Sequence, residues 1–490
     1  MDMYPGQQHD TEWQDLVFPS DYKNPTPDPE GYNLVVIGAG PAGLIVSIAA
    51  AGLGAKVALI ERHAMGGDCL NVGCVPSKAL IEMAERRHGG ADVSFADAMS
   101  WVREVRAGIS HHDSVERYTE NGVDVFLGEA AFEDATRVRV GDTVLTAAKF
   151  VIATGARAAV PPIPGLIEAE PRTNETIFDL REQPAVLGVI GAGPIGCELA
   201  QAFARLGSEV HLFEMADRPI PVEIPEAGEV LAKQLERDGV HLHLSTAAES
   251  IARDGDKRIV RTADGEFVVD ELLVALGRAP NVDSLNLEAA GVDFDPRKGI
   301  TVDDNLRTSN SRIFAAGDVC SKYQFTNNAD HQARIIIRNA LFFGRGKPDS
   351  TRIARCTYTD PEIAHVGAEE SDLRDAGVAF DTYRVEWDAM DRARAQADDR
   401  GFVRVLTEKG KDKILSATIV GADAGEQIAA LAVLVANGRG LGELDAAVPA
   451  YPTRSEYLRR LADAYNRTRL TPTVEKLFKW LLARQRKKVS

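Results

Sequence analysis

A short apolar run, a cluster of glycines and a second apolar stretch follow one another at two places in the chain. Residues 34–43 read LVVIGAGPAG, and residues 187–196 read LGVIGAGPIG. In each copy the pattern predicts a buried strand, a tight turn and then a helix, because the residues after the turn are rich in Ala and Leu. A second apolar strand follows each helix, at residues 57–61 and 210–214. The repeat therefore predicts two βαβ units, each the opening of a doubly wound α/β domain.

Each of these second strands ends on an acidic residue. Glu61 lies 23 residues after Gly38, and Glu214 lies 23 residues after Gly191. Glycines at the turn allow a pyrophosphate to approach the N-terminus of the helix, and a carboxylate at this distance accepts a hydrogen bond from a ribose hydroxyl. We interpret both units as dinucleotide-binding sites; the alternative is two βαβ turns with a structural role only.

Further apolar runs end in glycine turns and outline more strands, at residues 151–155, 272–280 and 312–318. The proline-rich residues 158–165 form a stiff connection, so we expect one domain to end near residue 160. The C-terminal third alternates predicted strands and helices without another glycine fingerprint, which indicates a separate α+β domain.

Composition and charge narrow the class of protein. The 490 residues are 44% hydrophobic, enough for a large core in two or three domains. The net charge of −17 repels nucleic acid, so nucleic acid is not expected as a partner. Five cysteines are too few for a disulfide-stapled secreted fold, and no apolar signal segment follows a basic start. We therefore expect a cytoplasmic protein in which a cysteine pair is catalytic.

Two of the five cysteines lie in one short motif, because residues 66–78 read GGDCLNVGCVPSK. Four residues separate Cys69 from Cys74, so their thiols can meet across one helical turn. This spacing also puts Cys74 at a helix N-terminus, where a thiolate is stabilised. The alternative is two unconnected buried cysteines. The other three lack such spacing and are expected to be small core residues: Cys197, Cys320 and Cys356.

In these motifs the chain resembles the pyridine nucleotide-disulfide oxidoreductases. The likeness rests on the cysteine segment, both glycine fingerprints, Ala-Thr-Gly at 153–155 and Ala-Ala-Gly-Asp at 315–318, and it spans nearly the whole chain. Residues 63–78 and 391–393 most resemble the mercuric-reductase-like members; dihydrolipoamide dehydrogenase and glutathione reductase belong to the same group. The resemblance implies two Rossmann-like dinucleotide-binding domains and a C-terminal α+β dimerisation domain, in a homodimer.

The resemblance also implies domain boundaries and cofactors. The domains would be an N-terminal extension at 1–30, an FAD-binding domain at 31–160 and 285–349, an NAD(P)-binding domain at 161–284, a dimerisation domain at 350–466 and a basic tail at 467–490. The cofactors would be FAD and NADH, with NADPH as the alternative nucleotide. The implied cofactor-binding residues are, toward FAD, Gly38, Gly40, Gly43, Glu61, Thr154, Gly155, Asp318 and Ala329, and, toward the nicotinamide nucleotide, Gly191, Gly193, Gly196, Glu214 and Gly277.

The implied reaction passes electrons from the nicotinamide through FAD to a Cys69–Cys74 disulfide and on to a small disulfide or thiol-bound acceptor. In this reading Cys74 faces the flavin and Cys69 exchanges with the acceptor. Lys78 and Glu198 resemble the buried ion pair that the family keeps beside the flavin, since a buried carboxylate needs a partner. The alternative for Glu198 is a charged residue on a solvated helix face. No metal site is expected.

One departure from the family pattern bears on the acceptor. Dihydrolipoamide dehydrogenase and glutathione reductase carry a His-x-x-x-x-Glu pair near the C-terminus, whereas this chain has Tyr451 and Glu456, and its last histidine is His365. A tyrosine with a pKa near 10 is a poor base at neutral pH, which disfavours a fast lipoamide or glutathione enzyme. Mercuric reductases carry tyrosine here. The alternative for Tyr451 is packing in the dimer interface. Asn327 also stands where relatives often have a histidine.

These observations leave several functions open. The leading hypothesis is an NAD(P)H-dependent reductase of a small disulfide or metal–thiol acceptor; mercuric ion reductase and dihydrolipoyl dehydrogenase are the alternatives. Against mercuric reductase, the chain lacks an N-terminal metal-binding domain and paired cysteines near the C-terminus, the last cysteine being Cys356. An NADH oxidase or peroxidase uses one cysteine sulfenic acid, so the presence of two cysteines argues against it. A non-enzymatic flavin-binding protein would leave two cofactor sites unexplained.

Two local sequence patterns predict the nucleotide preference and a membrane-binding surface. Glu214 favours NADH, because its carboxylate would repel a 2′-phosphate, although Arg218 could turn toward one. The tail from residue 467 holds eight basic residues and one acid. One apolar helical stripe runs beside them: Val474, Leu477, Phe478, Leu481 and Leu482. The stripe predicts peripheral contact of residues 473–490 with an anionic membrane; the alternative is a helix docked on its own dimer.

Overall fold

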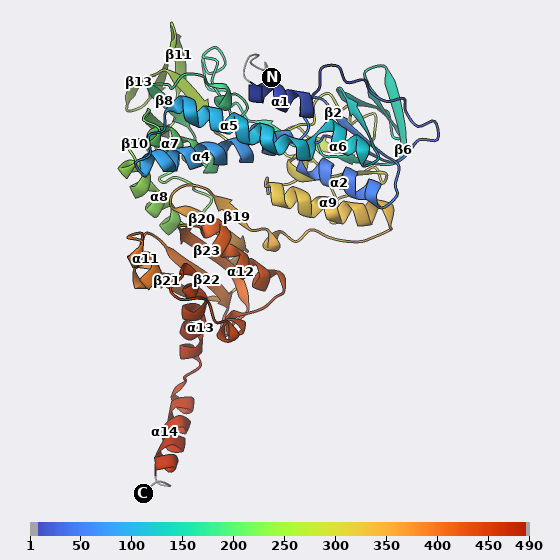
Figure 1. Ribbon diagram of the computed structural model, residues 1–490. Coiled ribbons are helices and arrows are strands. Elements are labelled where there is room, and N and C mark those ends of the chain that lie inside the picture. The colour runs from blue at the N-terminus through green and yellow to red at the C-terminus, as the bar shows by residue number, and fades with distance from the viewer. Residues whose placement is uncertain (1–7, 487–490) are drawn as a thin grey trace. The chain divides into compact units, whose positions relative to one another are not determined.

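The computed structural model describes residues 8–486. They form two compact units (Figure 1). Of the described residues, the first comprises 8–222 and 235–348, and the second comprises 223–234 and 349–486.

The first copy of the repeat builds a seven-stranded sheet in the first unit, with the order β3-β2-β1-β6-β5-β4 and with β18 paired to β6. Strands β1, β2, β3, β6 and β18 run parallel to one another. Strand β5 pairs antiparallel with both β4 and β6. The strands are β1 (Tyr32–Ile37), β2 (Val57–Glu61), β3 (Val123–Leu127), β4 (Ala130–Asp134), β5 (Arg137–Val140), β6 (Thr143–Ile152) and β18 (Ile313–Ala315).

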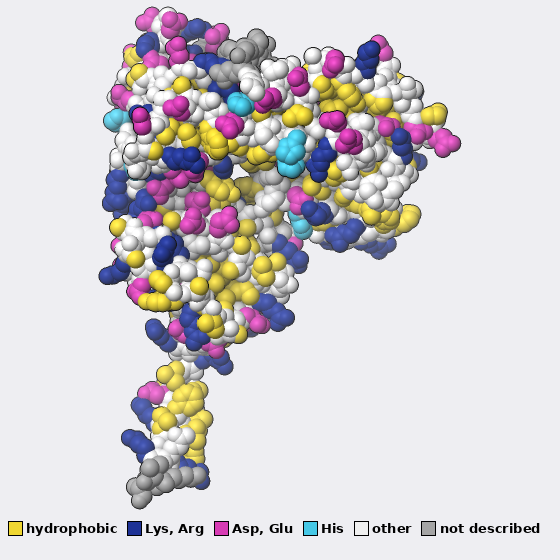
Figure 2. Space-filling model, viewed as in Figure 1, with side chains coloured by type: hydrophobic (Ala, Val, Ile, Leu, Met, Phe, Trp, Pro, Cys, Tyr) yellow, Lys and Arg dark blue, Asp and Glu magenta, His cyan; other side chains and the backbone are white. Residues whose placement is uncertain are grey.

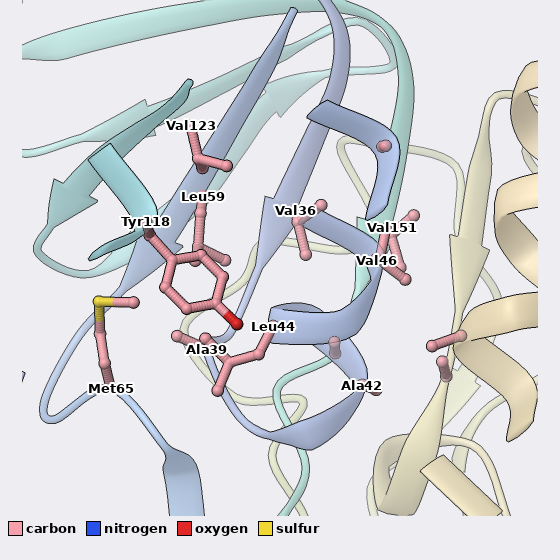
Figure 3. Close-up of a cluster of buried hydrophobic side chains, with 14 of the residues drawn as sticks. Val36, Ala39, Ala42, Leu44, Val46, Leu59, Met65, Tyr118, Val123 and Val151 are labelled. Atoms are coloured by element: carbon pink, nitrogen blue, oxygen red, sulfur yellow. The ribbon is translucent and has the colours of Figure 1, made fainter. Parts of the chain in front are cut away.

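Helices cover this sheet. Helix α2 begins at Pro41, directly after Gly40, as expected of a proline that needs no hydrogen-bond partner in the first helical turn. Figure 3 shows how Leu44 and Val46 of α2 meet Val36 and Leu59 of the sheet. All four are at most 5% exposed, and burying each contributes roughly 1.5–3 kcal/mol. The helices of this part are α1 (Gln8–Val17), α2 (Pro41–Gly52), α3 (Gly67–Asn71), α4 (Cys74–His88), α5 (Phe95–Ser110), α6 (Val115–Glu120) and α9 (Thr326–Leu341).

The second copy of the repeat builds a second parallel sheet in the same unit, with the order β10-β9-β8-β14. Helix α7 follows β8 just as α2 follows β1, and an antiparallel sheet β11-β12-β13 comes later in the chain. The elements are β8 (Val186–Ile190), α7 (Pro194–Arg205), β9 (Glu209–Phe213), β10 (Val240–His243), β11 (Ser250–Asp254), β12 (Lys257–Thr262), β13 (Gly265–Val269) and β14 (Glu271–Val274). Most of the helix between β9 and β10, α8 (Pro225–Arg237), is assigned to the second unit. Two short ladders complete the unit: β7 (Ala156–Ala158) with β15 (Arg278–Pro280), and β16 (Phe294–Asp295) with β17 (Gly299–Ile300).

The second unit is built on a five-stranded antiparallel sheet in the order β19-β20-β23-β22-β21. Its core includes Trp387, Val403 and Tyr457, all at most 1% exposed. The elements are β19 (Arg355–Thr357), β20 (Glu362–Gly367), α10 (Glu370–Asp375), β21 (Phe380–Glu386), α11 (Asp391–Ala395), β22 (Phe402–Glu408), β23 (Ile414–Gly421), α12 (Ala424–Ala436), α13 (Tyr457–Thr468) and α14 (Pro472–Arg486). Short 3₁₀ helices lie at His111–Asp113, Ile177–Asp179, Gly317–Val319, Ser350–Arg352, Trp387–Ala389, Leu441–Ala446 and Arg454–Glu456.

The predicted fold class is confirmed: two doubly wound parallel sheets precede a C-terminal α+β unit. Within residues 8–486 no helix is both long and apolar enough to cross a bilayer.

Candidate active site

The two glycine fingerprints have the same geometry. Gly38 and Gly191 adopt φ angles of 101° and 103°, a left-handed region that favours glycine. A Cβ on Gly43 would collide with the carbonyl oxygen of Gly38, and one on Gly196 would collide with that of Gly191. Each turn therefore needs its glycines so that helix and strand can approach this closely, which leaves the helix N-terminus open to a phosphate.

The acidic residues at the ends of the second strands hold the same turns. Glu61 accepts a hydrogen bond from the Ala39 amide at 2.7 Å, and Glu214 accepts one from the Ala192 amide at 2.8 Å. The second oxygen of each carboxylate accepts from a further backbone amide, that of His63 or Ala216. A carboxylate oxygen has two lone pairs, so each can still accept from a ribose hydroxyl.

A pocket opens beside the first fingerprint. It is lined by the ends of β1 and β2 and by three later loops, and its residues include Gly38, Glu61, Thr154 and Asn281. The Thr154 hydroxyl donates to the Asn281 carbonyl at 2.8 Å, and the Asn281 amide donates back to the Thr154 carbonyl at 2.9 Å. Gly155 follows with a φ of 67°. A carboxylate and an open turn in one recess fit the adenosine end of a dinucleotide such as FAD.

The cysteine segment differs from its predicted form. Cys69 lies in α3 and Cys74 is the first residue of α4, so the two thiols do not meet across one turn of a continuous helix. Val72 and Gly73 leave the helical conformation between them, with φ angles of −143° and −131°. The Val72 amide closes α3 by donating to Asp68, and a Cβ on Gly73 would lie 2.8 Å from the same Asp68 carbonyl oxygen. The expected helix N-terminus at Cys74 is present.

The two thiols interact, and all five cysteines of the chain are unbridged. A hydrogen bond from Cys69 lowers the pKa of Cys74 to about 6, against desolvation, which raises it. The Thr326 hydroxyl, 3.4 Å from the Cys74 sulfur, and the charge of Lys78 lower the pKa further. The same hydrogen bond raises the pKa of Cys69. In the reduced pair Cys74 is therefore the thiolate and Cys69 the thiol that donates to it.

A partly buried ion pair lies near these thiols in the first unit. The Lys78 ammonium donates to the Glu198 carboxylate at 2.8 Å, joining α4 to α7. Glu198 is only 6% exposed, so the alternative of a solvated helix face is wrong. Removing Lys78 would take this partner from the buried Glu198 carboxylate, which is expected to destabilise the fold.

A second charged cluster links the cysteine segment to the later glycine turns. Arg278 follows Gly277 and pairs with Asp68, and it lies 3.4 Å from Asp318. Burial raises the pKa of Asp318, while Arg278 lowers it. Ala329 of α9 is buried near Gly317. The sequence showed no role for Arg278 or Asp68, because their contact joins residues 210 positions apart.

The second unit holds the remaining predicted catalytic residues. The Tyr451 hydroxyl donates to the Asp391 carboxylate at 2.5 Å, and this bond raises the pKa of Tyr451. Glu456 pairs with Arg460 at 2.8 Å. His365 is 3% exposed and bonds Thr418, so it is a core residue. Tyr451 is 70% exposed, and its phenol is held as a neutral hydrogen-bond donor.

The other three cysteines lie outside the thiol pair. Cys197 is fully buried at the start of α7, and its thiol donates to the Ala192 carbonyl at 3.2 Å. Cys320 and Cys356 are partly buried. Burial raises the pKa of both Cys197 and Cys320, which makes their thiols unreactive.

Two repeated nucleotide-binding units and a thiol pair at a helix N-terminus define the class of nucleotide-dependent thiol–disulfide oxidoreductases. Residues 32–333 match the model of the family "Pyridine nucleotide-disulphide oxidoreductase", and residues 353–462 match its dimerisation domain. The chain belongs to this family.

Individual relatives support this family membership. The mercuric reductase of Lysinibacillus sphaericus is 35% identical over 454 residues, 89% of this chain and 83% of the relative. The dihydrolipoyl dehydrogenase of Haloferax volcanii is 34% identical over 464 residues, 88% and 96% of the two chains. The Cu(II) complex of the HOCl-induced flavoprotein disulfide reductase RclA from Escherichia coli has a TM-score of 0.80 at 30% identity, covering 87% and 98%.

Membership in the family establishes the class of reaction. The protein is an FAD-dependent NAD(P)H disulfide oxidoreductase, and its cofactors are FAD and NAD(P)H. The dimerisation-domain match supports a homodimer.

Proposed function

We propose that Cys69 and Cys74 are the redox-active pair, and that they pass electrons to a small disulfide or metal–thiol acceptor. The observation that carries the proposal is the hydrogen-bonded thiol and thiolate at the N-terminus of α4, beside Lys78. Bound FAD supplies the chemistry that takes a hydride from the nicotinamide and delivers its two electrons to the disulfide. The glycine turns with Glu61 and Glu214 bind the two nucleotides, and Lys78 with Glu198 keeps a fixed positive charge beside the Cys74 thiolate.

The exchange with a disulfide acceptor balances as follows. Cys69 loses its proton and attacks one acceptor sulfur, so a mixed disulfide forms and the other acceptor thiol leaves with a proton. The Cys74 thiolate then attacks the Cys69 sulfur, forms the Cys69–Cys74 disulfide and releases the second acceptor sulfur as a thiolate, which takes its proton from solvent. Cys69 starts as the donor of a hydrogen bond to Cys74, so its deprotonation needs a base. Tyr451 and Glu456 of one subunit are proposed to complete the Cys69 site of the other.

The side chain of Tyr451 favours one class of acceptor. A neutral phenol bonded to Asp391 does not take the proton from Cys69, so a metal–thiol complex is favoured over lipoamide, because the metal itself promotes loss of the thiol proton, which passes to the leaving thiolate. Mercuric ion is the sharpest candidate, because the mercuric reductases are relatives of this chain. Steady-state NADH oxidation with mercuric–thiol complexes, lipoamide, glutathione disulfide and oxygen tests the proposal. Turnover with oxygen alone would contradict it.

Other assignments belong to the same proposal. The FAD domain comprises 31–160 and 285–349, the NAD(P) domain 161–284 and the dimerisation domain 350–466. The cofactor residues are those at the two glycine fingerprints, together with Thr154, Asp318, Ala329 and Gly277. The protein acts in the cytoplasm.

NADH is expected to be preferred over NADPH by about tenfold or more in kcat/KM. The Glu214 carboxylate is held at the end of β9 by two amides, and like-charge repulsion of only about 1.4 kcal/mol gives a factor of ten. Arg218 is paired with Asp217 at 3.0 Å and so does not offset it. Glu214→Gln, which removes the charge and keeps the shape, should lower the ratio of kcat/KM for NADH to that for NADPH. Arg218→Ala should leave this ratio near the wild-type value. Equal kcat/KM values for both nucleotides in the wild type would refute the assignment of Glu214.

We also propose that α14 binds the surface of an anionic membrane. The helix has no buried residue, and its large apolar side chains are 41–56% exposed: Leu477, Phe478, Trp480, Leu481 and Leu482. Figure 2 shows them as a continuous apolar strip with basic side chains beside it. Residues 467–486 carry six basic residues and one acid, Glu475. Basic residues beside an exposed apolar stripe match an anionic bilayer surface. The predicted contact also includes 487–490, which lie outside the described residues.

Co-sedimentation with vesicles tests this contact. We expect binding to vesicles that contain phosphatidylserine and much weaker binding to pure phosphatidylcholine. Leu477→Ser with Leu481→Ser should weaken binding by about a hundredfold, because burying the two side chains contributes roughly 3 kcal/mol. Val433→Ser, at an exposed apolar position of α12, is the matched control. If the double variant instead dissociates the homodimer and vesicles bind neither form, the stripe is an interface with a second copy.

A further inference from the structure

The N-terminal helix α1 precedes the first strand of the family fold, yet it is firmly docked. Trp13 and Val17 are at most 2% exposed, and Asp10, a charged residue, is only 7% exposed. Trp13 and Val17 belong to the same hydrophobic core as Leu70 of the cysteine segment. The sequence indicated only an extension at this place. A docked helix with a buried charge implies specific partners.

Trp13 bonds a residue that lies between the two cysteines in the sequence. Its indole nitrogen donates to the side-chain oxygen of Asn71 at 2.7 Å. Asn71 is the last residue of α3 and is 4% exposed. With its oxygen held by Trp13, the Asn71 amide nitrogen donates back to the carbonyls of Gly67 at 2.9 Å and Met65 at 3.1 Å. The Trp13 bond therefore fixes the orientation of the amide that closes the segment carrying Cys69.

Asp10 and Arg106 hold Trp13 in place. Asp10 accepts from Arg106 and from Arg181, both at 2.9 Å. The Arg106 guanidinium lies 4.1 Å from the centre of the Trp13 ring and donates to the backbone carbonyl of Asn71 at 3.4 Å. Burial lowers the pKa of Arg106, and the charge of Asp10 raises it. A buried arginine that bonds both α1 and the cysteine segment makes the two move together.

Helix α1 also holds the beginning of the cysteine segment. The Met65 amide donates to the Val17 carbonyl at 3.1 Å, directly before the glycines that lead into α3. The helix thus contacts the segment at Met65 and again at Asn71, on both sides of Cys69. Asn71 is followed by Val72 and Gly73, whose backbone leaves the helical conformation between α3 and α4.

We infer that α1 is a brace for the redox loop, with Trp13 and Asp10 as positioning residues that set the equilibrium between the Cys69–Cys74 dithiol and disulfide. The inference rests on the proposed role of this pair. The brace holds Cys69 where it donates to the Cys74 thiolate, so it stabilises the reduced form. Loss of the indole N–H leaves the buried Asn71 oxygen without that donor, and the segment relaxes. The reduced form then loses part of its stabilisation.

Trp13→Phe is the direct test, since phenylalanine keeps an aromatic ring under Arg106 and removes only the N–H donor. The oxidised fraction of the pair is measured in glutathione buffers by alkylation and mass spectrometry of the purified holoenzyme. We expect the equilibrium to shift toward the disulfide by about tenfold, which is about 30 mV toward a more negative potential. Trp101→Phe, on α5 with its ring near Arg86, is the matched control and should not shift the equilibrium.

A double-mutant cycle separates positioning from general loosening. Asn71→Ala should also shift the equilibrium, and adding Trp13→Phe to it should change little more, because both substitutions remove the same hydrogen bond. Fully additive shifts, or an unshifted Trp13→Phe protein, would overturn the brace. If the wild-type cysteines fail to interconvert with glutathione at all, the proposed redox pair itself is wrong. Asp10→Asn supplies a second route to the same measurement if Trp13→Phe folds poorly.

Discussion

Replacing Cys74 with serine is expected to lower NADH-dependent reduction of every thiol or disulfide acceptor by at least about a thousandfold. The reason is that the variant can neither form the Cys69–Cys74 disulfide nor supply a thiolate at neutral pH. In the wild type the Cys69 hydrogen bond, Thr326 and Lys78 hold the pKa of Cys74 at about 6. A serine hydroxyl in the same place stays protonated. Steady-state NADH oxidation with the preferred acceptor measures the loss.

The control for this variant is Cys356→Ser, in the second unit and outside the thiol pair. It should retain near wild-type turnover, which shows that a generic cysteine replacement is harmless. Cys69→Ser should be as inactive as Cys74→Ser, because both thiols are needed for the exchange. If Cys74→Ser kept substantial turnover, the assignment of the redox pair would fall.

The pH dependence of alkylation tests whether the pKa of Cys74 is lowered. A lowered pKa means that the Cys74 thiolate persists down to about pH 6, so the reduced pair should react with iodoacetamide well below the usual thiol range. Reactivity should fall as the pH drops through 6. Glu198→Gln removes a negative charge that raises the pKa of Cys74, so it should move this midpoint to lower pH.

The parts of the fold that the sequence predicted depend on neighbours along the chain. The two glycine turns, their paired glutamates and the helix start at Cys74 are set by residues within one βαβ unit or one turn, and all of them were predicted correctly. The backbone conformation of Val72 and Gly73 was not, because the spacing of the two cysteines alone does not say where the helical turn before Cys74 ends. The distance between the cysteines is compatible with a continuous helix as well as with a broken one.

The missed parts of the site depend on residues far apart in the chain. Arg278 meets Asp68 across 210 positions, and Trp13 meets Asn71 across 58. No periodicity connects such pairs. The Tyr451–Asp391 bond, across 60 positions, was also not predicted, although the segment that contains Asp391 was noted for its resemblance to mercuric reductases. This bond raises the pKa of Tyr451, so the residue does not act as a phenolate near neutral pH, in line with the expectation that it is a poor base.

Removing the Tyr451 hydroxyl tests whether the phenol acts as a base or helps to hold the acceptor. Tyr451→Phe removes the hydroxyl and keeps the ring. It should leave the slow reduction of lipoamide or glutathione disulfide largely unchanged, because a neutral phenol does not accept the Cys69 proton. It should impair reduction of a metal–thiol complex if the phenol helps to hold that acceptor. Parallel assays with both acceptor types distinguish the two effects.

Tyr451→His is expected to raise turnover with lipoamide or glutathione disulfide by about ten- to a hundredfold, the usual contribution of a positioned general base. An imidazole titrates near neutral pH and can both take the proton of Cys69 and return it to the leaving thiol, which the phenol cannot do. Asp391 is placed to accept from the new imidazole and to raise its pKa, so adding Asp391→Asn to Tyr451→His should remove part of the gain and move the pH profile to lower pH. The measurement is kcat for the disulfide acceptor across pH 5 to 9. A wild-type enzyme that reduces lipoamide quickly with a flat profile would mean that another group serves as the base, and Tyr451→His would then give no gain.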